Sequence, residues 1–225
     1  MPMTTRHAFV SSFICAAVLF SLAAPAAYAA RIGFVQGKVT IVRGDKSMPA
    51  KTGLRLREGD EVTSEADAQA FFKFDDGARG LIRADSQLVV KELKLKGPSA
   101  ARQKTIRLAK GSLRYISGKA TVRQKVVFET STATIGIRGT DIEIVVTQEP
   151  VNDNNPGTFL KVNTGAATLA APDGTSVDVA AGEVVYGGEP ELSARGVGGK
   201  RRASARAVQA VGDLFKSSSL DRFMK

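Results

Sequence analysis

The sequence predicts an all-β fold: a single sandwich- or solenoid-like domain of short strands, with a short C-terminal amphipathic helix. Short runs rich in β-branched and aromatic residues recur at intervals of roughly ten residues, which is typical of sandwiches, barrels and solenoids. Clusters of Gly, Asp and Asn separate these runs, as expected of turns. No long helical period is present before Gly199. The clearest predicted strands are 39–42, 70–74, 87–90, 125–128, 142–146 and 158–162.

A loose repeat supports the β interpretation without deciding between its forms. Gly37, Gly111 and Gly165 each stand directly before a predicted strand. Their spacing is irregular, so the sequence leaves both a sandwich and a solenoid open.

The first 29 residues have the features of a secretory signal peptide. Arg6 precedes an apolar stretch from about Ala8 to Ala23, and Ala27-Tyr28-Ala29 offers a cleavage site before Ala30. A retained membrane anchor is the alternative, although the stretch is near the lower length limit for spanning a bilayer. We therefore expect a periplasmic or secreted protein of a Gram-negative-type envelope, with no transmembrane segment after signal cleavage.

Loss of the signal peptide would remove much catalytic chemistry. Cys15 and His7 are the only residues of their types, so the mature chain offers no thiol, no Cys/His zinc site and no Ser-His-Asp triad. Carboxylates such as Asp75 and Asp76 read as turn residues, and the 152–155 loop lacks the spaced acids of a calcium loop. We expect no catalytic residues, no metal and no cofactor. A carboxylate-based enzyme is the least favoured interpretation.

The composition divides the mature chain into a body, residues 31–188, and a tail, residues 189–225. The full chain has a formal net charge of +10, and the tail carries a large share of it, with Asp213 and Asp221 its only acids after Glu191. A Gly-rich linker at 196–199 opens the tail. Its predicted binding residues are Lys200, Arg201 and Arg202.

The tail's charge suggests a partner or anionic-surface contact, whereas no nucleic acid is expected because base-stacking aromatic residues are few. Ala203 to Phe215 is the predicted helix, with Val208, Val211, Leu214 and Phe215 on one face. We expect this tail to bind rather than to stabilise, so its removal should leave the melting temperature nearly unchanged. Docking of the apolar face onto the body is the alternative.

The most distinctive stretch runs from Thr130 to Ile144 and contains Gly136-Ile137-Arg138-Gly139-Thr140. Gly136 and Gly139 can adopt positive φ or allow close backbone approach at a strand corner. Arg138 between them can donate several hydrogen bonds to turn carbonyls or to an acid. Thr132 suits a strand position. We interpret Thr132, Gly136, Arg138, Gly139 and Thr140 as structural, with direct partner binding as the alternative.

This stretch resembles the signature of the FecR family of exported bacterial domains, in which a Thr-x-Thr-Ala run leads to a Gly-x-Arg-Gly-Thr core. The segments 54–64 and 72–77 fit the same pattern, so the resemblance covers about Gly37 to Val146. It implies a sensory or adaptor module outside the inner membrane that contacts an envelope protein. The family's anti-sigma members add a cytoplasmic segment and a membrane helix, and neither is expected here.

The function expected from these observations is a non-enzymatic protein-interaction, signalling or scaffold module of the periplasm. A binding module for cell-wall glycan or another polymer is the second interpretation. The sequence contains no Trp, which limits sugar stacking.

Overall fold

The computed structural model describes residues 30–95, 98, 101–118, 124–152, 154–188, 204–208, 212–215 and 217–225. Within these residues the chain is mostly strand, and the strands form one continuous mixed sheet. The all-β prediction is confirmed. The predicted signal peptide at 1–29 lies outside the described residues. None of the helices in the described part is long and apolar enough to cross a membrane.

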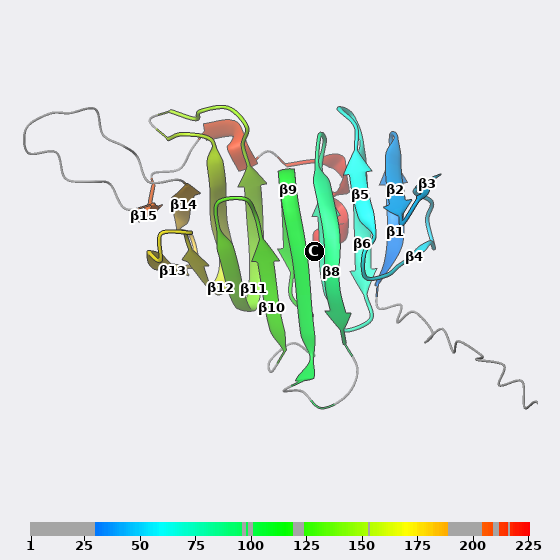
Figure 1. The fold of residues 1–225 in the computed structure, drawn as a ribbon, viewed down its shortest axis with the longest axis horizontal. Helices are drawn as coiled ribbons and strands as arrows, with labels where there is room; N and C mark the ends of the chain where they lie inside the picture. Colours follow the sequence, from blue (N-terminus) through cyan, green and yellow to red (C-terminus); the bar gives the residue numbers. More distant parts are fainter. Residues whose placement is uncertain are drawn as a thin grey trace, which may run out of the picture.

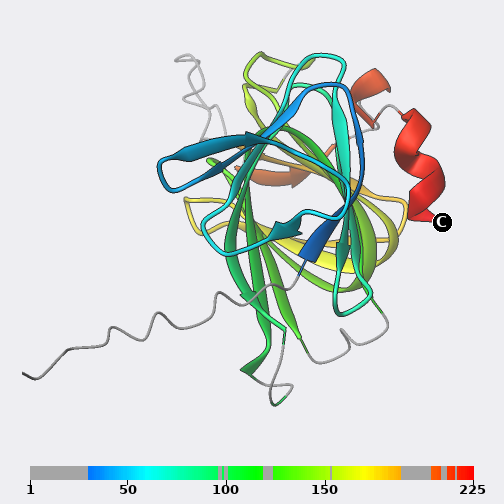
Figure 2. The ribbon, with the colours of Figure 1, turned by 90° about the vertical axis from the view of Figure 1, so that its right-hand side faces the viewer.

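The continuous sheet folds over itself into two layers, which Figure 2 shows along the long axis of the molecule. Layer A follows the order β3-β2-β5-β8-β9-β10-β11-β12-β13. Its shorter strands are β2 (Val39–Arg43), β3 (Lys46–Pro49), β5 (Glu61–Ser64), β8 (Gln87–Lys94), β10 (Lys125–Glu129) and β13 (Ser176–Ala180). Among the described strands, only β9 and β10 pair in parallel.

Layer B follows the order β4-β1-β6-β7-β9-β11-β12-β14-β15. Its shorter strands are β1 (Ala30–Gln36), β4 (Arg55–Leu56), β6 (Gln69–Phe74), β7 (Arg79–Ile82), β14 (Val184–Gly188) and β15 (Ala205–Ala207). Figure 1 shows the strands of both layers running across the long axis of the molecule.

Three long strands belong to both layers: β9 (Gln103–Ile116), β11 (Thr134–Val146) and β12 (Gly157–Ala170). Each changes partners where it contains a glycine with positive φ, which is +84° at Gly111, +63° at Gly139 and +83° at Gly165. Such a conformation strains any residue that carries a Cβ atom. These glycines therefore mark the corners at which the chain passes from one layer to the other.

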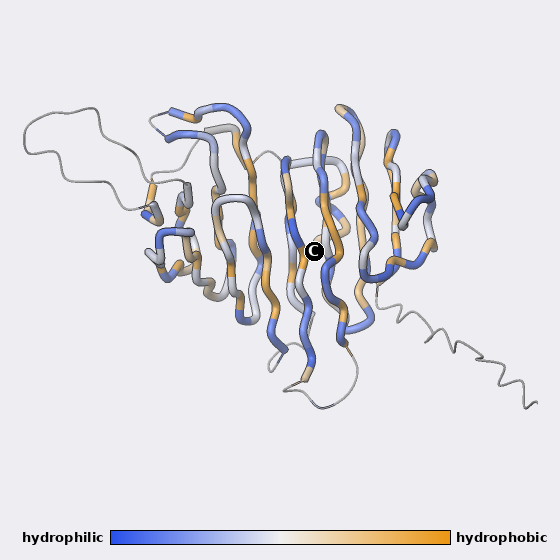
Figure 3. Tube along the Cα trace, in the orientation of Figure 1, coloured by the Kyte–Doolittle hydropathy of each residue, from blue (hydrophilic) through white to orange (hydrophobic). Residues whose placement is uncertain are grey.

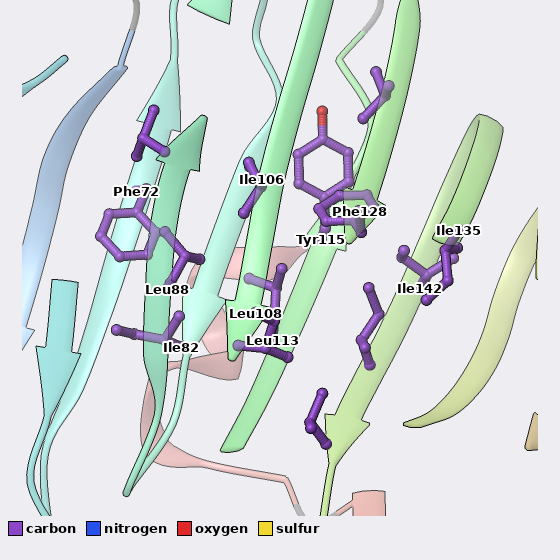
Figure 4. Close-up of a cluster of buried hydrophobic side chains, with 14 of the residues drawn as sticks. Phe72, Ile82, Leu88, Ile106, Leu108, Leu113, Tyr115, Phe128, Ile135 and Ile142 are labelled. Carbon is purple, nitrogen blue, oxygen red and sulfur yellow. The ribbon is translucent and has the colours of Figure 1, made fainter. Parts of the chain in front are cut away.

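The main core fills the space between the layers. It is built from the inward half of each alternating strand, including Phe72, Leu88, Ile106, Phe128 and Ile142 (Figure 4). Hydrophobic and hydrophilic residues alternate along many of the strands (Figure 3), as a strand with one buried face requires. The predicted strands therefore supply the two facing layers of a sandwich.

The C-terminal tail differs from the predicted helix over Ala203 to Phe215. Ala205–Ala207 forms β15, which pairs with the edge strand β14. In the described part of the tail, the helical residues form two short 3-10 helices, η3 (Gly212–Phe215) and η4 (Ser219–Met224). A free sheet edge offers unpaired N–H and C=O groups, and these three residues satisfy them as a strand.

Candidate functional site

The Gly136–Thr140 motif lies in the first half of β11 and at its corner. Gly139 has a φ of +63°, and the register between β11 and β12 shifts between Arg138 and Asp141. A Cβ atom on the facing Gly165 would lie 2.5 Å from the Gly139 carbonyl oxygen. Two glycines thus let β11 and β12 cross between the layers in close contact. Gly136 lies in regular strand, and a Cβ atom there would meet nothing within 4 Å.

Thr132 and Thr140 of this stretch form hydrogen bonds with neighbouring segments. Thr140 is buried, its N–H donates to Ser117 Oγ (3.1 Å), and its carbonyl accepts from Ser117 N (2.8 Å). Thr132 Oγ1 lies 2.8 Å from Thr158 Oγ1 and donates to the Gly187 carbonyl at 3.0 Å. The Thr132 contacts join the loop before β11 to β12 and β14.

Arg138 differs from the expected bracing role. Its side chain is exposed, and within the described part of the chain it makes no hydrogen bond or ion pair. The reason is alternation along β11: Ile135 and Ile137 face the core, so Arg138 faces outward with Gly136. The bonds to turn carbonyls that the motif suggested are not made by this side chain.

Arg138 and Gly136 line a groove of about 770 Å³ on the outer face of layer A. The groove follows β10, β11, β12 and β13. Val127, Gly136, Thr168 and Asp178 stand side by side in register across these four strands. The open space above Gly136 and the small side chains around it leave this part of the face hollowed.

The sides of this groove, which we call the layer A groove, carry opposite charges. On the β10–β11 side, Val126 of β10 pairs with Ile137 of the antiparallel β11. Lys125 and Arg138 are the next residues beyond this pair on the two strands, so the two cations lie opposite each other. On the other side, Asp178 Oδ1 accepts from Thr168 Oγ1 (2.7 Å), and Glu183 Oε2 accepts from Ala180 N (2.8 Å). All four charged residues are exposed.

Part of the outer face of layer B is covered by the chain's own tail. Leu220 and Met224 of η4 are buried against Phe71 and Leu81, and Phe223 stacks on Phe71 with ring centroids 5.3 Å apart. A second apolar cluster brings tail residues onto layer B farther along: Val208, Leu214 and Phe215 pack against Val145, Phe159, Val184 and Tyr186. Figure 2 shows η4 on the outside of the layers.

Between the two clusters, a polar network joins the tail to layer B. The Asp221 carboxylate accepts from Arg114 Nη1 (2.9 Å) and Arg83 Nη2 (3.2 Å). Burial opposes the charge of Asp221, but the Ser218 N–H and these two guanidinium groups outweigh it and lower the pKa of Asp221. Arg114 also donates two hydrogen bonds to Asp141 (3.1 and 2.8 Å), and these raise the pKa of Arg114.

The contacts of the tail favour the alternative, docking on the body, over the expectation that removal of the tail leaves the melting temperature nearly unchanged. Leu220 and Met224 are removed from water by layer B and other described apolar residues of the tail are partly buried, while the Asp221 carboxylate is paired with two arginines. The predicted binding residues Lys200, Arg201 and Arg202, and the predicted helix residue Val211, lie outside the described residues.

A buried lysine between the layers, Lys104, was not predicted from the sequence. Lys104 is fully buried; its Nζ donates to Asp76 Oδ2 (2.9 Å) and Tyr115 OH (2.8 Å) and lies 3.9 Å from the Phe74 ring centroid. Burial lowers the pKa of Lys104 to about 8, against the raising influence of Asp76. The alternation Lys104-Ile106-Leu108 was the available signal, because it sets a lysine on the inward face of β9.

Within the part of the chain that the structure describes, this centre is shielded from solvent. The Lys104 side chain is 0% exposed and that of Asp76 is 5% exposed, and the Tyr115 and Phe74 rings are buried in the core. Among the described residues, no three His, Cys, Asp or Glu side chains gather as metal ligands would. The layer A groove is therefore the more accessible of the two arrangements.

No curated protein matches the sequence. Two crystal structures, at 1.65 and 2.50 Å resolution, of a "putative anti-sigma factor" from Parabacteroides distasonis ATCC 8503 each share 10% identity with this chain, with a TM-score of 0.47. Each match covers 65% of this chain and spans 59% of the other.

A family model matches a defined part of the sequence. The matched residues are 60–168, which begin directly before β5 and end within β12. They include the Gly136–Thr140 motif and the β10–β12 part of the layer A groove. Over residues 60–168 this chain is a FecR domain, the domain of the family described as FecR protein.

Proposed function

We propose that this protein is a non-enzymatic protein-interaction or scaffold module of the bacterial envelope, and that it docks proteins through the layer A groove. The FecR domain supports a role in envelope signalling or assembly. The signal peptide predicted at residues 1–29 supports placement in the periplasm.

The observation that carries this proposal is the contrast between the two outer faces. On the outside of layer B, two apolar clusters and the guanidinium groups of Arg83 and Arg114 are in contact with the tail. In the layer A groove, Lys125 and Arg138 are exposed and have no side-chain partner within the described residues. An exposed arginine beside a hollow apolar floor is a typical protein-contact surface.

Glycan binding finds less support on this face. Sugar-binding surfaces usually stack aromatic rings on the sugar, and the described aromatic residues all lie in the core, on the outside of layer B or in the tail. These residues are Phe34, Phe71, Phe72, Phe74, Tyr115, Phe128, Phe159, Tyr186, Phe215 and Phe223.

Site-specific photo-crosslinking in a Gram-negative host tests the proposal. A photoreactive residue at the exposed groove position Ala166 is expected to form adducts with polypeptides in the periplasmic fraction. The same residue at Asp45, exposed in the turn between β2 and β3, is the matched control and is expected to form few. Equal adducts at both positions, or adducts with peptidoglycan fragments alone, would refute protein docking at the groove.

A further inference from the structure

We propose that the occupant of the layer A groove is a second copy of this chain, packed face to face about a two-fold axis that runs along β12. This inference rests on the proposed function and names the partner for the same surface. An isologous contact of this kind requires a surface that is complementary to itself in both shape and charge.

The shape requirement is met along the proposed axis. The outward residues of β12 are Ala166, Thr168 and Ala170, and those of the neighbouring β11 include Thr134 and Gly136. Two sheets that meet through residues this small can approach closely over the strip that lies on the axis. On β12 itself the outward side chains are all small, so none of the three would hold the two faces apart along the axis.

The charge requirement is met on either side of the axis. Rotation by 180° about β12 exchanges the position of β11 with that of β13, because these are the two layer A neighbours of β12. Arg138 of one copy is thereby placed over Asp178 and Glu183 of the other. The two-fold symmetry makes this contact twice, once on each side of the axis. Opposite charges face each other at both ends of the contact.

The same charge pattern disfavours a partner of a single sign. An acidic peptide would satisfy Lys125 and Arg138 but would face Asp178 and Glu183 across the groove, and a basic peptide would meet the reverse problem. Like charges brought together at an interface oppose association. A copy of the same surface carries both signs in the order required.

Sedimentation equilibrium of the exported full chain tests this inference through a charge swap. The parent is expected to show a concentration-dependent monomer–dimer equilibrium. Arg138→Glu and Glu183→Arg, each alone, set two like-charged pairs across the axis and are expected to raise the dimer dissociation constant by about tenfold or more. The double variant restores opposite charges and is expected to recover most of the lost affinity.

Controls separate the possible failures. Lys46→Glu reverses an exposed charge on β3, away from the groove, and is expected to leave the dissociation constant unchanged. Asp178→Lys provides a second reversal on the acidic side in case loss of the Glu183–Ala180 bond disturbs the turn. A monomeric parent at all concentrations, or single reversals without effect, overturns the inference. Adducts from Ala166 to other polypeptides would then leave the proposed function standing.

Discussion

Replacement of Lys104 by alanine is expected to lower the free energy of unfolding by about 3–5 kcal/mol, the usual cost of breaking a buried ion pair. The substitution leaves the Asp76 carboxylate, whose side chain is 5% exposed, without its ammonium partner, and opens a cavity beside Phe74 and Tyr115. Urea unfolding followed by circular dichroism measures the change. The exposed Lys73→Ala is the control and is expected to change stability by no more than about 0.5 kcal/mol.

The same lysine gives the protein a distinctive pH dependence. The pKa of Lys104 is about 8 in the folded protein and 10.5 in its ordinary state, so the unfolded chain binds more protons between these values. Stability contributed by this group therefore rises with pH above about 8. Burial raises the pKa of Tyr115 well above 10, so its contribution falls once the unfolded tyrosine ionises. The rise from pH 8 to 10 should be absent in Lys104→Ala; an equal rise in both proteins contradicts this assignment.

Truncation after Gly188 is expected to destabilise the protein by at least about 3 kcal/mol, since it removes two fully buried side chains, Leu220 and Met224, from layer B. For a chain of this size, that loss corresponds to a fall in Tm of about 6–12 °C. It also leaves Arg83 and Arg114 without the Asp221 carboxylate. Differential scanning calorimetry measures the shift.

Point variants show whether docking of η4 is the cause. Leu220→Ala is expected to cost about 2–5 kcal/mol, whereas the exposed Ser217→Ala in the same tail should be nearly neutral. An unchanged Tm for both the truncated protein and Leu220→Ala would show that the tail does not stabilise the body, as the sequence alone suggested.

The fold class was predictable because apolar and polar residues alternate along many of the strands, as expected of strands with one buried face. The layer crossings were visible only in part. Gly37, Gly111 and Gly165 form a loose repeat, and all three have positive φ; the last two lie at corners of long strands. Nothing local in the sequence shows that β9, β11 and β12 each serve both layers, because that depends on pairings between distant segments.

The candidate site was predictable only in part: partner binding by the motif was the alternative interpretation, and the predicted binding residues Lys200, Arg201 and Arg202 lie outside the described residues. The motif drew attention to Gly139 and Arg138 together, yet the glycine lies at the corner and the arginine faces outward. The acidic side of the groove, Asp178 and Glu183, was not predicted from the sequence. These residues lie near Arg138 only because β13 pairs with β12 in the folded sheet. Asp221 likewise meets Arg83 and Arg114 across more than a hundred residues of sequence.

The proposed separation of roles within the Gly136–Thr140 motif, a structural Gly139 and a docking Arg138, is tested most directly by urea unfolding of Arg138→Ala beside Gly139→Ala. The arginine makes no contact that the described fold depends on, so its variant is expected to keep the parent's midpoint. The glycine variant is expected to lose about 1 kcal/mol, because alanine is strained at a φ of +63°. A midpoint for Arg138→Ala that falls as far as that of Gly139→Ala would show that Arg138 holds the fold, and would contradict its role in docking.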